Sequence, residues 1–188
     1  MTRFLTAAAV AIFVVTPAAA NEFAPQLKAL AEGDIRTVVS DPIVIEAIRA
    51  QNAETAGLSE ADILSRDRAW RDQIGASVRP LIDDVLTGSA ADLLRAHAEA
   101  STGTYTEIFV MDAVGLNVAA SAVTSDYWQG DEAKWQDSFT QNAVHIGEIE
   151  FDESTQSFQS QVSVPVHDPA TGKPIGAATF GVNIELLD

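Results

Sequence analysis

The first half of the chain carries apolar residues at helical spacing. From Asn21 to Ser101 they recur every three or four positions, which places them on one face of a helix. The first stripe comprises Leu27, Leu30, Ala31, Ile35 and Val38. Asp41-Pro42 predicts a helix start, because aspartate caps free N–H groups and proline lacks the N–H that a first turn leaves unpaired. Ser59-Glu60-Ala61-Asp62 resembles a capping box, which predicts a second start.

From Thr104 onward the apolar positions alternate with a period of two, as in strands that bury one face. The predicted strands are Glu107–Met111, Leu116–Val123, His145–Phe151, Ser157–His167 and Ile175–Leu187. In the fourth strand the alternation predicts one face with Phe158, Val162, Val164 and Val166, and the other with Gln159, Gln161 and Ser163. Asp112–Gly115 predicts a turn in which the glycine has a positive φ.

These patterns predict an α+β fold. A helical N-terminal arm over 21–101 precedes a five-stranded antiparallel sheet over 102–188, and a helix and loop from the polar, aromatic-rich segment 124–142 cover one face. No internal repeat or flexible linker separates the two halves, so we expect them to form one structural unit.

The first twenty residues have the three parts of a secretory signal peptide. Arg3 provides the positive start, Phe4–Val15 the apolar run, and Pro17–Ala20 the small residues of a cleavage site. The apolar run is shorter than the roughly 20 residues that span a membrane. We therefore predict a signal peptide over 1–20, cleavage near Ala20 and a secreted, periplasmic product; the alternative is an uncleaved membrane anchor.

The charge balance is strongly acidic. The chain has 27 Asp and Glu residues against 11 Lys and Arg, a formal net charge of −16 at pH 7. Such a surface repels phosphate backbones, so we expect no nucleic-acid partner. The sequence has no cysteine, which excludes disulfides and thiolate metal sites.

The sequence offers little support for catalysis. His97, His145 and His167 are far apart and lack the spacing of a metal pair on one element. Ser121 and Ser125 have no neighbouring histidine with which to form a hydrolytic triad. We expect no enzymatic activity, no metal and no cofactor.

Four segments carry a resemblance to a known family. They are Tyr105–Asp112, Thr124–Trp135, His145–Ile149 and Pro174–Val182, in this order after a helical arm. The order resembles the extracytoplasmic PAS-like sensor domains called Cache or PDC domains, which bind small molecules in bacterial chemoreceptors and sensor kinases. The resemblance implies a PAS-like sheet and a ligand-binding role in signal transduction.

The end of the sequence departs from membrane-anchored members of that family. In those proteins the last strand leads into a transmembrane helix and a signalling module, whereas this sequence ends at Asp188. We therefore expect a stand-alone binding module that acts through a partner, such as a membrane sensor kinase, chemoreceptor or transporter.

The candidate ligand site lies in the segment from Asp126 to Phe139, where aromatic and polar residues alternate. An aromatic wall with a few polar groups is typical of small-ligand clefts. The resemblance implicates Tyr127, Trp128, Asp131 and Trp135, with Phe109, Met111 and Ser121 as lining residues, and the charge pattern adds Lys134. The alternative for each tryptophan is a structural role in fixing the helix to the sheet.

The charge of the ligand is open at this point. A carboxylate ordinarily binds an arginine fork, but no arginine follows Arg95, which leaves Lys134 and backbone N–H groups. Tyrosine and tryptophan beside Asp131 suit a cationic amine instead. We expect a small polar metabolite, an amino acid, amine or short carboxylate.

Two other functions stay open. The chain could be an interaction or structural protein that kept the fold and lost the pocket, or an enzyme that uses a serine, histidine or carboxylate site. The N-terminal helices are also compatible with a homodimer, although packing against their own sheet explains their apolar face equally well.

Overall fold

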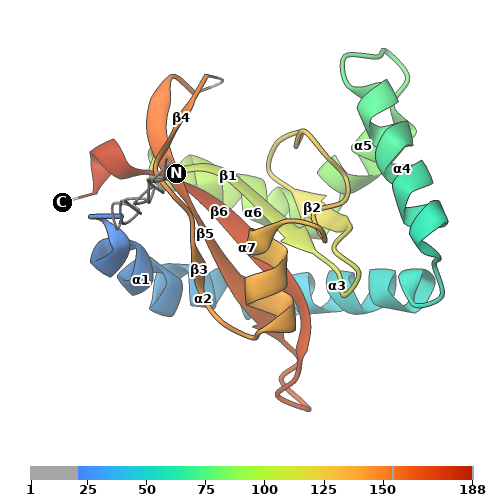
Figure 1. The fold of residues 1–188 in the computed structure, drawn as a ribbon, viewed down its shortest axis with the longest axis horizontal. Helices are drawn as coiled ribbons and strands as arrows, with labels where there is room; N and C mark the ends of the chain where they lie inside the picture. The colour runs from blue at the N-terminus through green and yellow to red at the C-terminus, as the bar shows by residue number, and fades with distance from the viewer. Residues whose placement is uncertain (1–20, 154, 188) are drawn as a thin grey trace, which may run out of the picture.

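The computed structural model describes residues 21–153 and 155–187, and the predicted signal peptide over 1–20 lies outside the described residues. Helices fill the first part of this region, as predicted (Figure 1). They are α1 (Ala24–Glu32), α2 (Asp34–Val39), α3 (Pro42–Thr55), α4 (Glu60–Gln73), α5 (Pro80–Leu86) and α6 (Ser89–Ala100). None of the helices in the described ranges is long and apolar enough to span a bilayer.

The predicted helix starts are confirmed. The Asp41 carboxylate accepts a 2.8 Å hydrogen bond from the backbone N–H of Ile43 at the start of α3. Ser59 and Asp62 form both hydrogen bonds of the capping box at the start of α4. The first apolar stripe is divided between two helices. The backbone leaves helical geometry at Gly33, which separates α1 from α2.

The second part of the chain forms an antiparallel sheet, which confirms the α+β fold class. Its strands are β1 (Tyr105–Met111), β2 (Asn117–Ala120), β3 (His145–Ile146), β4 (Glu150–Asp152), β5 (Ser157–His167) and β6 (Pro174–Asn183). Their order is β2-β1-β6-β5-β3, and β4 also pairs with β5. A short helix α7 (Ala133–Trp135), a π-helical turn η1 (Gln136–Thr140) and a final 3-10 turn η2 (Ile184–Leu186) complete the described elements.

The strand predicted over His145–Phe151 is divided in two. Pairing with β5 continues as far as Gly147, whose N–H donates to the Gln161 carbonyl at 2.8 Å. It resumes at Glu150, opposite Gln159. The sheet therefore has the predicted strands, with the third replaced by the short pieces β3 and β4.

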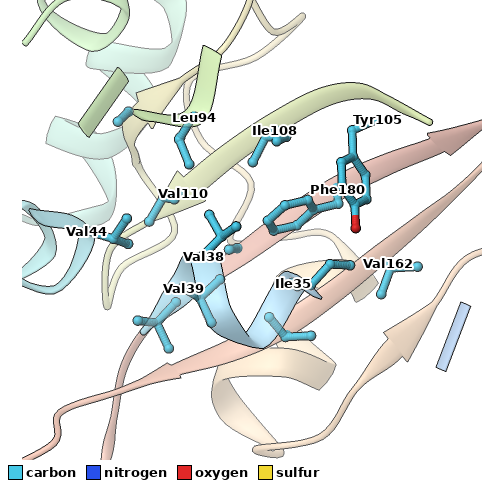
Figure 2. Packing of buried hydrophobic residues seen from close by; sticks show 14 of the residues in the cluster. Ile35, Val38, Val39, Val44, Leu94, Tyr105, Ile108, Val110, Val162 and Phe180 are labelled. Atoms are coloured by element: carbon cyan, nitrogen blue, oxygen red, sulfur yellow. The ribbon is translucent and has the colours of Figure 1, made fainter. Parts of the chain in front are cut away.

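One face of the sheet carries the main core, together with α1, α2, α3 and α6. Ile108 and Val110 of β1 and Phe180 of β6 point into it, and Val38 of α2 packs against them (Figure 2). The Tyr105 hydroxyl at its margin donates to Asp34 of α2 at 2.7 Å.

The opposite face packs against the segment after β2 and against α4 and α5. Phe109 and Met111 alternate with the residues of the first face, as the period of two predicts. In Figure 1, α7 lies in front of the sheet and α3 behind it, while α4 and α5 project to one side. This second face carries the candidate site.

Phe158 lies outside the core, although the alternation predicts that it shares a face with Val162, Val164 and Val166. Its side chain is 47% exposed and packs edge-on against Phe151 of β4, with ring centroids 5.2 Å apart. The reason is that β5 extends past the end of β6: the pairing of these strands begins at Gln159 opposite Asn183, and Phe158 pairs with Phe151 of β4 instead. Val162, Val164 and Val166 lie in the core as predicted.

Candidate functional site

A small polar cavity lies between the second face of the sheet and the segment that crosses it. Its volume is about 50 Å³, and its lining residues are Glu107, Phe109, Thr124, Ser125, Gln129, Lys134 and Gln161. Two of the predicted residues, Phe109 and Lys134, are thus brought together here. The others come from β1, β5 and residues 124–129, which are far apart in the sequence.

A glycine on the central strand makes the floor of the cavity polar. Gly181 of β6 pairs with Glu107 on one side and with Gln161 on the other. A Cβ atom at Gly181 would lie 2.9 Å from the Glu107 Cγ atom, closer than packing permits. In its absence the Gln161 side chain reaches Glu107, and its Nε2 donates to the carboxyl Oε1 at 3.0 Å.

Burial controls the ionisation of Glu107. Loss of contact with water disfavours the carboxylate and raises the pKa of Glu107 above its usual range. The hydrogen bond from Gln161 and the positive charge of Lys134 oppose this rise without cancelling it. A cationic group placed beside Glu107 would favour its charged form.

Lys134 closes one side of the cavity. Its Nζ atom lies 3.0 Å from Glu132 Oε2, 3.4 Å from Gln161 Oε1 and 5.3 Å from the centre of the Phe109 ring. Its side chain is only 12% exposed, so this ammonium group is held in a largely desolvated position by an ion pair and an aromatic face.

Gln129 contributes an unpaired acceptor. Gln129 is only 2% exposed. Its Nε2 donates to the Asp126 carbonyl at 2.9 Å, and this hydrogen bond fixes the orientation of the side-chain amide. Its Oε1 has no donor within reach among residues 21–153 and 155–187. A buried carbonyl without a donor costs about 1–3 kcal/mol. The cavity beside it therefore offers a site that a donor group from a ligand would satisfy.

The segment from Thr124 to Trp135 forms the roof of the cavity, and helix α4 holds this roof segment in place. The Asp67 carboxylate is buried and its Oδ1 accepts from the backbone N–H groups of Tyr127 (3.0 Å) and Trp128 (3.1 Å). Arg71 pairs with Asp67 and also with Asp126, at 2.8 Å. The roof is thus attached to α4 by its backbone as well as by charge.

An aromatic contact strengthens this attachment. Trp70 of α4 is fully buried and stacks on Tyr127, with ring centroids 5.4 Å apart. Its indole Nε1 donates to the Thr124 carbonyl at 2.9 Å. Burial raises the pKa of Tyr127 to about 12.

The predicted tryptophans lie at the base of the roof segment. The Trp128 indole N–H donates to the Val114 carbonyl at 2.9 Å, and the Trp135 indole N–H donates to the Asp112 carbonyl at 3.1 Å. Trp135 also stacks on Phe139, with ring centroids 5.0 Å apart. Both indoles therefore bind the turn between β1 and β2, and a ligand contact for them stays a prediction.

The remaining predicted residues, Met111, Ser121 and Asp131, do not line the cavity. Met111 is buried in the cluster below it, and the Ser121 hydroxyl accepts from the Ile108 N–H at 2.9 Å. Asp131 is exposed and lines a separate surface hollow beside Arg71 of α4. Their part in ligand binding also stays a prediction.

Sequence reasoning missed Glu107 and Gln129 as site residues. A signal existed for Glu107, which is a charged residue at the start of an otherwise apolar strand. No comparable signal existed for Gln129, because its importance depends on burial and on the missing donor.

A larger hollow adjoins the cavity. It has a volume of about 340 Å³ and shares Lys134 and Gln161 with the small cavity. Its other lining residues include the acidic side chains Glu132, Glu148 and Glu150. Within the described ranges no group of three or more His, Asp or Glu side chains is arranged to hold a metal ion.

No protein-family model and no curated protein matches the chain. Solved structures similar to it include the ligand-binding domain of the Campylobacter jejuni chemoreceptor Tlp3 in complex with L-norvaline, at 14% identity and a TM-score of 0.41. The sensor domain of the V. cholerae histidine kinase DctB has 12% identity and a TM-score of 0.38. The ligand-binding domain of the Pseudomonas aeruginosa amino-acid chemoreceptor PctC, in complex with GABA, has 14% identity and a TM-score of 0.41.

The matched regions cover most of this chain and part of each solved structure. They include 87% of the chain for Tlp3 and DctB and 88% for PctC. The corresponding shares of the solved chains are 60%, 58% and 62%. These are distant similarities to sensory domains, and membership of the Cache family stays a prediction.

Proposed function

We propose that this protein is a binding module for a small polar ligand that carries an amine, taken up in the cavity between Glu107, Gln129 and Lys134. The observation that carries the proposal is the buried Oε1 atom of Gln129, which has no donor among the described residues. An ammonium group provides the missing N–H, and it pairs with the Glu107 carboxylate on the same cavity.

The size and charge of the site support this ligand class. A cavity of about 50 Å³ accommodates a head group of a few non-hydrogen atoms. The adjoining acidic hollow offers room for the rest of the ligand past Lys134 and Gln161. If the ligand is an amino acid, Lys134 is the cation that its carboxylate would meet.

We further propose that the module reports its ligand through a partner. The roof segment contains Gln129 and is bonded to α4 through Asp67, so a ligand that draws Gln129 inward would also act on α4. Such a response requires the ligand to bind one arrangement more tightly than the other. A periplasmic location and a membrane sensor kinase, chemoreceptor or transporter as the partner belong to this proposal.

The test is calorimetric titration with amino acids, amines and short carboxylates, followed by the variant Gln129→Met. Methionine keeps the length of the side chain and removes the acceptor together with the Nε2 donor, whose partner, the Asp126 carbonyl, still accepts from Asn117 and Thr124. We expect an amine ligand to bind the variant about tenfold more weakly, the equivalent of one lost hydrogen bond to a charged group. Without ligand, the melting temperature of the variant should equal or exceed that of the original protein, because the unpaired acceptor is gone.

Gln136→Met is the matched control, because Gln136 is exposed and lies outside the cavity. It should leave affinity unchanged. Absence of binding by every ligand class, or equal affinities for both variants, would refute the proposal.

One observation favours the alternative of an interaction protein. The indole N–H groups of Trp128 and Trp135 are both used by backbone carbonyls of the turn between β1 and β2, so the aromatic segment serves the fold. This alternative predicts no ligand-dependent shift in melting temperature and recovery of a protein partner in a pull-down.

A further inference from the structure

A second cavity lies on the other face of the sheet, between the N-terminal helices and β5. Its volume is about 340 Å³, within the range of roughly 300–1,000 Å³ that is common for ligand pockets. Its lining residues are Ala31, Arg36, Val39, Ser40, Ile45, Asn142, Val144, Val164, Pro165, His167 and Pro169. It shares none of them with the site described above.

The base of this cavity is apolar. Val39 of α2, Ile45 of α3 and Val164 of β5 each expose 4–5% of their surface and line it together with Ala31 and Val144. Contact with a hydrocarbon group would remove this surface from water, which favours an apolar body in the ligand.

The polar groups at its edge are hydrogen-bond donors. The Arg36 guanidinium is exposed and forms no ion pair with any residue in the described ranges. The Ser40 hydroxyl likewise forms no hydrogen bond with any residue in the described ranges. The His167 Nε2 lies 2.7 Å from Asn142 Oδ1, and because a carbonyl oxygen only accepts, the ring N–H donates and the Asn142 Nδ2 group stays free to donate elsewhere.

This donor set is unusual for the molecule. The chain has 27 acidic residues, yet none of the described residues that line the cavity is Asp or Glu. Asp168 follows His167, but Arg49 holds its carboxylate at 2.8 Å and its pKa is lowered by that contact. Asp41 follows Ser40 and caps α3. The unpaired positive charge of Arg36 therefore has no acidic competitor within the cavity.

We propose that this cavity is a second binding site, for a monocarboxylate with a short apolar chain. The carboxylate pairs with Arg36 and accepts from Ser40 or Asn142, and the chain lies on the apolar base between α2, α3 and β5. The site is independent of the proposed amine site, because the two lie on opposite faces of the sheet and share no residue.

The experiment is calorimetric titration of the full chain with hexanoate, compared with the variant Arg36→Gln. We expect saturable binding at one site and a loss of about tenfold or more in the variant, as for removal of a charge-assisted hydrogen bond. Arg68→Gln is the matched control, since Arg68 is an exposed helical arginine that also forms no ion pair among the described residues. It should bind hexanoate like the original protein.

Two further ligands and one further variant complete the test. Hexan-1-ol lacks the charge and acetate lacks the chain, so both should bind at least tenfold more weakly than hexanoate. Gln129→Met should bind hexanoate normally, which separates this proposal from the first. Undetectable hexanoate binding, equal binding by Arg36→Gln, acetate as strong as hexanoate, or loss of binding in Gln129→Met would each overturn the second site.

Discussion

At the scale of single residues, the site depends on polar groups that the fold keeps away from water. The buried Glu107 carboxyl accepts a hydrogen bond from Gln161 and lies near the positive charge of Lys134, but these contacts replace only part of its hydration. Gln129 is bonded at its nitrogen and unpaired at its oxygen. Such groups reduce the stability of the empty protein and increase the gain from a ligand that completes them.

The raised pKa of Glu107 predicts how the stability of the protein depends on pH. A carboxyl whose pKa is higher in the fold than in the unfolded chain binds more protons when folded, so its contribution decreases as pH rises through the folded pKa. Glu107→Gln should therefore raise the free energy of unfolding at pH 7. The difference from the original protein should become smaller as pH falls through the folded pKa, and it should vanish below the ordinary glutamate pKa of about 4.3, where Glu107 is protonated in the folded and the unfolded chain alike.

Urea unfolding at a series of pH values measures this difference. Glu150→Gln is the control, since Glu150 is exposed on β4. A destabilised Glu107→Gln variant at pH 7 would mean that the charged form of Glu107 is favoured by the fold, contrary to our interpretation.

At the scale of elements, α4 determines where the roof of the small cavity lies. The roof segment has little regular structure of its own, and its backbone N–H groups at Tyr127 and Trp128 find their acceptor on the Asp67 side chain. Trp70, one turn along α4, stacks on Tyr127. An exposed helix would not need a buried carboxylate, so the presence of Asp67 is explained by the loop that it holds.

Replacement of Asp67 should loosen this loop. Asp67→Ala removes the acceptor for two backbone N–H groups, each worth about 1–3 kcal/mol when left buried and unpaired. We expect a loss of roughly 2 kcal/mol or more in the free energy of unfolding and faster hydrogen exchange at the amides of Tyr127 and Trp128.

Asp72→Ala on the exposed side of α4 controls for the change in helix composition and charge. It should alter the free energy of unfolding by less than about 0.5 kcal/mol. Unchanged amide exchange in Asp67→Ala would show that the loop keeps its position without α4.

At the scale of the whole molecule, the sheet separates two hollows of different character. The face toward α7 carries acidic and amide groups, and the face toward α2 and α3 carries Arg36 over an apolar base. The strands alternate between the faces, so β5 contributes Gln161 to one site and Val164 to the other.

The two tyrosines provide a probe of the whole fold at alkaline pH. The pKa of Tyr127 is raised to about 12 by burial, and that of Tyr105 is raised further by burial and by Asp34. Raised pKa values make folding stability decrease as pH rises above about 10, because the unfolded chain releases these protons more easily. We expect no tyrosinate absorbance from the folded protein at about pH 10.5.

Ultraviolet titration with circular dichroism at the same pH values tests this expectation. Both tyrosines should ionise in one step that coincides with loss of the folded signal, since they lie on opposite faces of one sheet. Tyrosinate formation while the circular dichroism signal is intact would contradict the burial of the corresponding hydroxyl.

Local patterns in the sequence are sufficient to predict most helices and strands of this protein. Apolar spacing predicts the helical arm and the alternating strands, and the caps at Asp41 and Ser59 form as the local chemistry requires. These features depend on neighbours within a few residues, which a sequence displays directly. The division of the strand at Gly147 and the exposure of Phe158 depend on where pairing with β5 and β6 begins and ends, which a sequence does not display.

The sites were decided by the tertiary structure. The segment from Asp126 to Phe139 could be identified from its composition, yet its tryptophans bind the turn after β1 while Glu107, Gln129 and Gln161 line the cavity. The room between Glu107 and Gln161 depends on Gly181, on a third strand. The isolation of Arg36 likewise depends on which residues lie around it in space. Burial and missing partners are properties of the packed molecule, because they arise between residues far apart in the chain.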